Sequence, residues 1–139
     1  MRQQVQQFEI PTRGPGAVQI TAPVVDWVRG TGIRTGLLTL HVRHTSASLL
    51  IQENADPEVM QDLERFFQRL APPGDPLFRH TTEGPDDMPA HVRSALTLTT
   101  LSVPVVDGQP TLGTWQGIFL YEHRKRPHRR VVVAHLLGE

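Results

Sequence analysis

Residues 97–123 read TLTTLSVPVVDGQPTLGTWQGIFLYEH, and two largely apolar runs flank the dipeptide Asp107-Gly108. Asp-Gly favours the positive φ values of a tight β-turn, so this stretch predicts a β-hairpin. Its two strands are expected over Thr97–Val106 and from about Thr111 to His123. A hairpin of this length indicates that an antiparallel sheet forms the centre of the fold.

Other strands and helices are predicted on both sides of the hairpin. Alternating or apolar runs indicate strands over residues 3–10, 37–45, 48–52 and 131–137. Short helices are expected after the N-cap candidates Thr21, Asp56 and Asp87, because a proline follows each within two residues. The buried stripes of the last two helices should be formed by Val59, Leu63, Phe66, Phe67 and Leu70, and by Met88, Val92, Ala95 and Leu96. The pattern predicts one α+β domain over residues 1–139, with a mainly antiparallel sheet or sandwich covered by a few short helices.

The composition excludes several classes of protein. A chain of 139 residues, 38% of them apolar, can bury one hydrophobic core and leaves little room for a second domain. It has no cysteine, which excludes disulfides, thiolate catalysis and cysteine zinc sites. The N-terminal residues are polar, and no apolar run approaches the ~20 residues of a membrane-spanning helix. A cytoplasmic location with no membrane partner is therefore expected.

The charge balance argues against nucleic acid as a partner. The 14 basic and 14 acidic residues cancel, which does not favour a general polyanion-binding surface. The run Arg124–Arg130 is basic but has no aromatic residue for base stacking, so a solvated hairpin loop is the favoured interpretation. Two alternatives stay open for this loop, namely binding the phosphate of a small molecule and salt-dependent association with RNA.

The densest group of ionisable residues lies in His80–His91, which reads HTTEGPDDMPAH. Two imidazoles and three carboxylates share a segment stiffened by two prolines, and such donors suit Zn²⁺, Mn²⁺ or Fe²⁺. The alternative is that the aspartates cap a helix while the histidines are solvated. Capping explains Asp87 but not His80, Glu83 and His91 together, so a functional site is the favoured interpretation.

Two other segments could contribute to that site. His44 ends the strand over residues 37–45 and would supply a third imidazole if folding brings it near His80 and His91. An isolated histidine at a strand end is otherwise an ordinary, partly buried side chain. Glu53 and Asn54 have no evident local role, which makes them candidates for binding or general base catalysis.

The string Gly113-Thr-Trp-Gln-Gly117 is the remaining unusual feature. Glycines inside an apolar strand indicate a bulge or close backbone approach. Trp115 is equally consistent with stacking on a ligand and with packing in the core. Glu122, further along the same predicted strand, is interpreted as a surface residue.

These strings occur together, and in order, in a known family. The chain carries His44–Ala47, Glu53–Pro57, His80 with Glu83–His91, and Gly113–Gly117. From about Gly36 to the C-terminus it resembles the YjbQ family. The resemblance implies a compact α+β protein that forms a homotrimer, with a polar, histidine-rich pocket near a subunit interface. It also implies a weak thiamine-phosphate synthase activity, which joins a hydroxymethylpyrimidine diphosphate to a thiazole phosphate.

The resemblance and the residue chemistry together assign expected roles. A divalent metal ion, Zn²⁺ or Mg²⁺, would be held by His44, His80 and His91. Catalytic groups would be Glu53, Glu83 and Asp86, and substrate would be bound by Thr45, Asn54, Gly113, Trp115 and Gln116. The leading hypothesis is a metal-binding enzyme that acts on a small phosphorylated substrate. The alternative is a non-catalytic protein that binds a small molecule or an anion.

Overall fold

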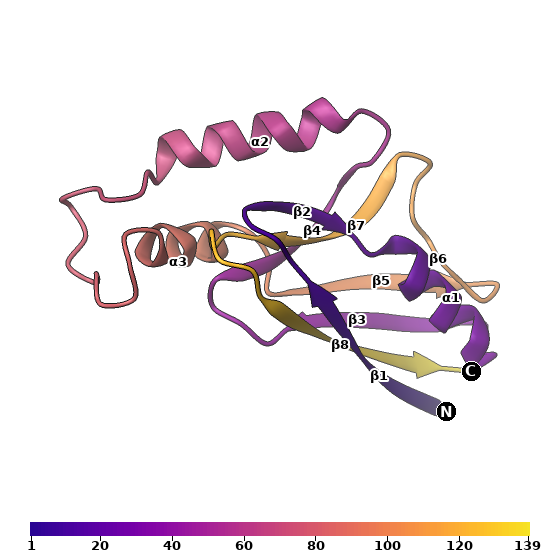
Figure 1. Ribbon diagram of the computed structural model, residues 1–139. Coiled ribbons are helices and arrows are strands. Elements are labelled where there is room, and N and C mark those ends of the chain that lie inside the picture. The colour runs from indigo at the N-terminus through magenta and orange to yellow at the C-terminus, as the bar shows by residue number, and fades with distance from the viewer.

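Eight β-strands and three α-helices follow one another along residues 1–139, all of which the computed structural model describes (Figure 1). The N-terminal elements are β1 (Arg2–Pro11), β2 (Gly16–Gln19), α1 (Thr21–Thr31), β3 (Gly36–Val42) and β4 (Ala47–Glu53). Two helices come next, α2 (Pro57–Leu70) and α3 (Asp87–Leu96). The last four elements are β5 (Thr100–Val106), β6 (Gln109–Pro110), β7 (Gln116–Glu122) and β8 (Arg129–Gly138).

The strands form two antiparallel sheets. One has the order β1-β8-β3-β5-β6 and the other the order β2-β7-β4. Alternate side chains of β3, such as Leu38 and Leu40, are fully buried and pack with Leu49 and Ile118 of the smaller sheet in a core of 18 residues. The prediction of an α+β fold built on mainly antiparallel strands is confirmed.

Two glycines allow the backbones of β3 and β8 to approach closely where β3 begins and β8 ends. Gly36 and Gly138 face each other in the register of these strands. A Cβ atom at Gly138 would lie 2.1 Å from the carbonyl oxygen of Thr35, and one at Gly36 would lie 2.3 Å from that of Leu137. Only glycine allows this close approach of β3 and β8, and the C-terminal strand β8 lies between β1 and β3 in the sheet.

The predicted Asp107-Gly108 turn is present, but the second strand of the hairpin is much shorter than expected. Asp107 and Gly108 have φ values of 52° and 77°, as this type of turn requires. The strand after the turn ends at Pro110, and the next strand, β7, begins at Gln116 in the other sheet. Residues 111–115 therefore cross between the sheets, and within this crossing the Gly113 amide donates a hydrogen bond to the side-chain oxygen of Gln116 at 2.8 Å.

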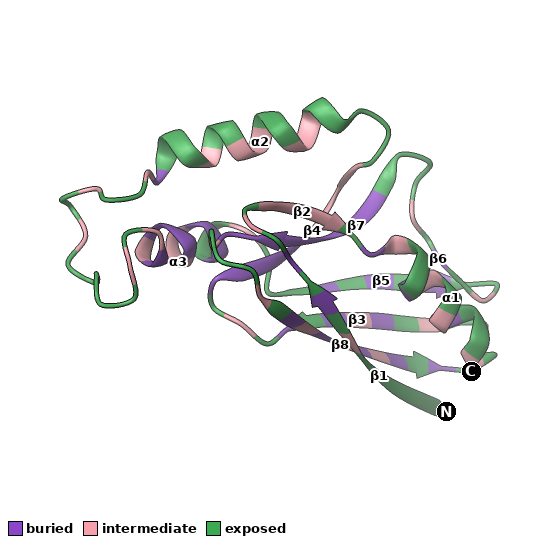
Figure 2. Cartoon of the chain, in the orientation of Figure 1, coloured by how far each residue is buried: buried purple, intermediate pink, exposed green.

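Helix α2 lies beside the small sheet and buries none of its residues. It begins as predicted, since the Asp56 side chain accepts a hydrogen bond from the Glu58 amide at 2.9 Å. Its apolar stripe, however, is not buried as expected, and Phe66 and Leu70 are 49% and 51% exposed. Figure 2 shows the helix as exposed or intermediate along its length. Contact with the buried residues is limited to a few groups, such as Phe67, whose ring centroid lies 6.0 Å from that of Tyr121.

Helix α3 buries a different face from the one predicted. Its buried residues are Asp87, Pro89, Ala90, Arg93 and Ser94, whereas Leu96 is 59% exposed. Its polar side chains are hydrogen-bonded, since Ser94 donates to the carbonyl of Ala47 and Arg93 donates to Glu64. Hydrophobic periodicity could not identify this face. None of the three helices is long and apolar enough to cross a bilayer.

Candidate functional site

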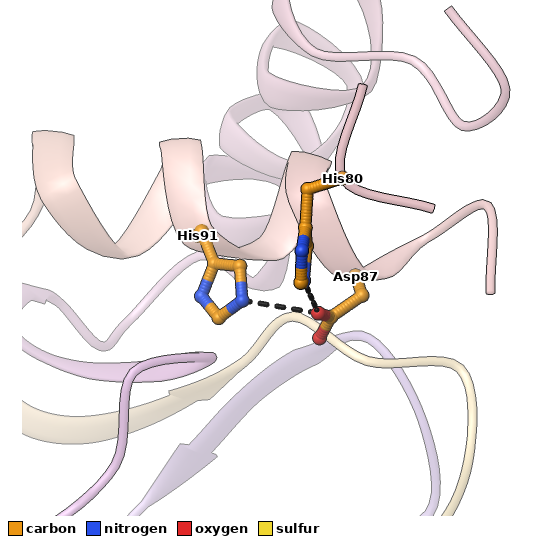
Figure 3. Close-up of side chains that lie close together, drawn as sticks. All are labelled: His80, Asp87 and His91. Carbon is orange, nitrogen blue, oxygen red and sulfur yellow. Dashed lines mark hydrogen bonds and ion pairs between the residues drawn. The ribbon is translucent and has the colours of Figure 1, made fainter. Parts of the chain in front are cut away.

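Three side chains of the His80–His91 segment converge on one oxygen atom (Figure 3). Asp87 and His91 lie four residues apart on α3, and therefore on one face of the helix, while His80 approaches from the preceding loop. The Nε2 atoms of His80 and His91 lie 2.8 and 3.0 Å from Oδ2 of Asp87. The three possible ligand atoms all lie within 4.8 Å of one another. This trio, called here the His80–Asp87–His91 cluster, can hold a cation.

A hydrogen bond sets the protonation of one ring. Nδ1 of His91 lies 2.9 Å from the backbone carbonyl oxygen of Thr45. A carbonyl oxygen can only accept, so Nδ1 must carry the hydrogen and donate it. In the neutral ring, Nε2 then presents a lone pair to the carboxylate of Asp87. Two lone pairs at 3.0 Å repel each other unless a proton or a cation lies between them.

Arg124 holds the carboxylate of the cluster in place from the other side. Its Nη1 donates to Oδ1 of Asp87 at 2.7 Å, which leaves Oδ2 for the two histidines. Burial raises the pKa of Asp87, but hydrogen bonds and charges from His80, His91 and Arg124 lower it overall. The aspartate side chain is only 6% exposed, against 47% for His80 and 31% for His91. The cluster thus has a buried anionic base and two imidazoles that solvent can reach.

The prediction that Asp87 caps α3 is wrong. Asp86, not Asp87, occupies the N-cap position of α3, and its side chain makes no capping hydrogen bond. Oδ2 of Asp86 accepts two hydrogen bonds, one from Nε of Arg124 at 3.1 Å and one from the Lys125 amide at 2.9 Å. Glu83 contributes its backbone carbonyl to Arg124 at 2.9 Å, and its side chain does not join the cluster. The i, i+4 spacing of Asp87 and His91 was the sequence signal that could have identified Asp87.

His44 does not join the other two imidazoles. Its Nε2 accepts a hydrogen bond from the Val131 amide at 2.8 Å, so this ring nitrogen is already engaged. Burial lowers the pKa of His44, and the nearby Arg130 guanidinium lowers it further. The structure therefore groups His80 and His91 with Asp87 and does not bring His44 to them.

The environment of His44 is dominated by a buried ion pair that the sequence did not reveal. Nε and Nη2 of Arg130 donate to the two carboxylate oxygens of Glu122 at 2.8 and 2.5 Å, and Thr12 donates to the same carboxylate at 2.6 Å. Both charged side chains are almost completely buried. Burial raises the pKa of Glu122, but the hydrogen bonds from Arg130 and Thr12 lower it overall. Glu122 is thus not a surface residue, and the Arg124–Arg130 run is not simply a solvated loop.

The remaining predicted site residues gather at the far end of β4. Glu53 and Gln116 are register partners, and the Asn54 amide donates to the Trp115 carbonyl at 2.9 Å. Trp115 is 62% exposed, which excludes the alternative that it packs in the core. The seven residues of β4 span roughly 20 Å and separate this group from Thr45, which contacts His91 through its carbonyl and has an exposed side chain. One chain therefore does not bring all the predicted site residues together.

An open cavity of about 540 Å³ lies between α2 and the small sheet, next to this second group. Glu53, Asn54, Glu64 and Phe119 are among the residues that line it. One oxygen of Glu53, Oε2, is buried without a hydrogen-bond partner. The cavity has the size of a small-molecule site and combines polar groups with an aromatic ring.

Comparison with known proteins gives the family of this chain. Residues 6–139 match the family model described as "UPF0047 protein YjbQ-like". The chain belongs to the YjbQ family. It is 52% identical to the UPF0047 protein sll1880 of Synechocystis, over 99% of this chain and 94% of the relative. It is 48% identical to the UPF0047 protein YjbQ of Escherichia coli O157:H7, over 77% of each chain.

Solved structures of similar proteins share the fold of this YjbQ-family chain. The conserved hypothetical protein TT1486 from Thermus thermophilus superposes with a TM-score of 0.85 at 40% identity, over 95% of this chain and 99% of the other. A YjbQ/UPF0047-family protein from Clostridium acetobutylicum gives a TM-score of 0.87 at 29% identity, over 95% and 99%. The names of these relatives identify a family and a fold but no reaction.

Proposed function

We propose that this YjbQ-family chain is a metal-binding enzyme that acts on a small phosphorylated substrate. The observation that carries the proposal is the convergence of Nε2 of His80 and Nε2 of His91 on Oδ2 of Asp87, at 2.8 and 3.0 Å, with Nδ1 of His91 donating to Thr45 so that the neutral ring turns its other nitrogen toward the carboxylate. Histidines that bind metals commonly donate their other ring hydrogen to a carbonyl or carboxylate, as His91 does to Thr45. A cation between the ring and the carboxylate would replace their repulsion by two attractive contacts.

The donor set favours zinc over magnesium. Two imidazole nitrogens and one carboxylate oxygen are typical zinc ligands, and three protein ligands leave a fourth position for substrate or water. Magnesium prefers six oxygen ligands, which the His80–Asp87–His91 cluster does not supply. A bound divalent cation would supply positive charge to neutralise a phosphate or diphosphate group. The side chains themselves hold the site, since Arg124 fixes Asp87 and Thr45 fixes His91.

The proposed reaction is the weak thiamine-phosphate synthase activity. In it the thiazole nitrogen forms a bond to the methylene carbon of the pyrimidine, the C–O bond to the diphosphate breaks, and pyrophosphate leaves. The exposed ring of Trp115 offers a surface on which a heteroaromatic ring can stack. Glu53 and Asn54 line the adjoining cavity and could position the bound ring.

A homotrimer would bring together the two groups of predicted site residues that a single chain keeps apart. We propose that the unpaired apolar face of α2, with Phe66 and Leu70 about half exposed, packs on a neighbouring copy. Such packing can bring the Trp115 end of one chain toward the His80–Asp87–His91 cluster of another. Light scattering on the purified protein should give three times the chain mass of 15.6 kDa. Phe66→Asp should shift this mass toward that of the single chain, whereas Arg69→Asp, at an exposed polar position on the same helix, should not.

The reaction is tested with the two phosphorylated substrates and a matched pair of variants. His91→Ala should lower kcat/KM at least tenfold, because it removes a metal ligand and the contact to Thr45. His41→Ala is the control, since His41 is exposed on β3 and bonds only to Thr100. Production of thiamine phosphate at equal rates by both variants and the wild type would exclude a role for the cluster in this reaction.

A non-catalytic binding protein is the second candidate, favoured by the open cavity under α2, which combines polar side chains with the Phe119 ring. Thermal shifts separate the two candidates. Stabilisation by phosphorylated compounds with no turnover of any of them would favour the binding protein.

A further inference from the structure

A cavity of about 290 Å³ lies in the loop between α2 and α3, beside the His80–Asp87–His91 cluster. Residues 71–86, which form this loop, contain no helix or strand (Figure 1). Loops of this length without secondary structure are uncommon and usually functional. His80 belongs both to the wall of the cavity and to the cluster. A molecule in the cavity would therefore lie next to any cation that the cluster holds.

The wall of this cavity is mainly apolar. Phe78 and Met88 are partly buried and contribute an aromatic ring and a thioether. Pro76 and Pro85 add two rigid rings, and Thr81 adds a hydroxyl group. Aromatic rings pack favourably on one another, and the sulfur of methionine makes favourable contacts with them. The wall therefore suits a ligand that carries an aromatic ring.

Hydrogen bonds within the loop give the cavity its shape before any ligand binds. The Gly74 amide donates to the Pro85 carbonyl at 3.2 Å and joins the two ends of the lining segment. The Asp75 side chain accepts from the Leu77 amide at 2.9 Å, and the Asp75 carbonyl accepts from the Phe78 amide at 3.1 Å. Binding then does not have to order this part of the loop, which favours affinity.

The volume of the cavity and the neighbouring cluster limit what it can hold. Small-molecule sites usually enclose about 300–1,000 Å³, so this cavity lies at the lower end and admits one small ring. A cation at the His80–Asp87–His91 cluster would attract a phosphate group. The combination fits a compound in which a short linker joins one aromatic ring to a phosphate.

We propose that this cavity binds the aromatic ring of a phosphorylated substrate, with the ring packed on Phe78 and Met88 and the phosphate at the cluster. The inference rests on the proposed function, and it concerns the substrate that loses the diphosphate. That ring then binds within a single chain, and Trp115 is left for the other substrate. Phe78 and Met88 would determine specificity, since a phosphate without a ring gains nothing from the cavity.

The three methionines of the chain allow a direct test by NMR. Met88 lines this cavity, Met60 lines the cavity under α2, and Met1 is exposed. The methionine methyl groups are isotope-labelled, and the zinc-loaded protein is titrated with benzyl phosphate. The Met88 signal should shift with saturation, because an aromatic ring changes the magnetic field at a methyl group beside it. Methyl phosphate, which has no ring, should bind about tenfold more weakly.

A matched pair of variants tests the role of Phe78. Phe78→Ala should weaken the binding of benzyl phosphate about tenfold and leave that of methyl phosphate unchanged, because only the contact with the ring is lost. Leu77→Ala is the control, since Leu77 is 77% exposed and does not line the cavity. An unchanged Met60 signal in the free Phe78→Ala protein would show that this variant is folded.

The outcomes separate this inference from the proposed function. A shift confined to Met60, equal affinity of the wild type for the two phosphates, or equal losses in the two variants would overturn the inference. The titration is then repeated in EDTA. A saturable Met88 shift with the same affinity in zinc and in EDTA would support the ring site but contradict the metal-dependent function.

Discussion

Glu122→Ala is expected to destabilise the folded chain by about 3–5 kcal/mol, because it leaves the guanidinium of Arg130 buried without its counter-charge. The two side chains are 0% and 4% exposed and share two hydrogen bonds. Thr12 would also lose its acceptor, which lies 2.6 Å away. The free energy of unfolding, measured by urea denaturation at pH 7, reports the loss.

An exposed ion pair in the same region of the fold provides the control. Glu9 pairs with Arg129 at 3.3 Å, where the side chains are 64% and 78% exposed. Glu9→Ala should cost less than about 1 kcal/mol, because solvent screens the pair. Equal losses in the two variants would mean that the Glu122–Arg130 pair does not stabilise the fold as its burial indicates.

The pair should also make stability depend on pH. The pKa of Glu122 is lower in the folded chain than its ordinary value, despite burial, because Arg130 and Thr12 donate to it. Its contribution is therefore present above the ordinary glutamate pKa and is lost as the pH falls through the lowered value. The difference between the wild type and Glu122→Ala should shrink over that acidic range.

Asp87→Ala is expected to lower zinc affinity by about 100-fold or more, since the variant loses the carboxylate that faces both imidazoles. Competition with a chromogenic zinc chelator measures this affinity on the folded protein. The matched control is Asp86→Ala, which also removes a carboxylate partner of Arg124 but no member of the cluster. This control should retain zinc affinity within a few fold. A similar loss in both variants would assign the effect to Arg124 and not to a zinc ligand.

Local turn and capping signals predicted much of the fold. Asp107-Gly108 adopts the expected turn, and Asp56 caps α2 as its sequence indicated. The sequence could not predict where the second strand of the hairpin ends, because a tertiary arrangement decides that the segment after Pro110 crosses to the other sheet. It also could not show that the apolar stripe of α2 lacks a partner within one chain. Hydrophobic periodicity identifies the apolar face of a helix but not the element that packs against it.

The site was predicted in part, and the errors have a common physical origin. His80 and His91 come together as expected, because they are close in sequence and one of them lies on a helix. His44 is distant in sequence, and its position depends on how β8 aligns with β3, which places the Val131 amide against its ring. Glu122 and Arg130 lie on the neighbouring strands β7 and β8 of different sheets, and they are buried together only once both sheets have formed. Local sequence pattern does not show such pairing of charges between sheets.

A crystal of this protein soaked with zinc, with data collected on both sides of the zinc absorption edge, tests the metal site most directly. We predict one anomalous peak bonded to Nε2 of His80, Nε2 of His91 and Oδ2 of Asp87, at the ~2.0–2.2 Å expected for such ligands. His44 should stay bonded to the Val131 amide. A fully soaked crystal with no peak among these three side chains, or with its principal peak at His44, would contradict the proposed metal site.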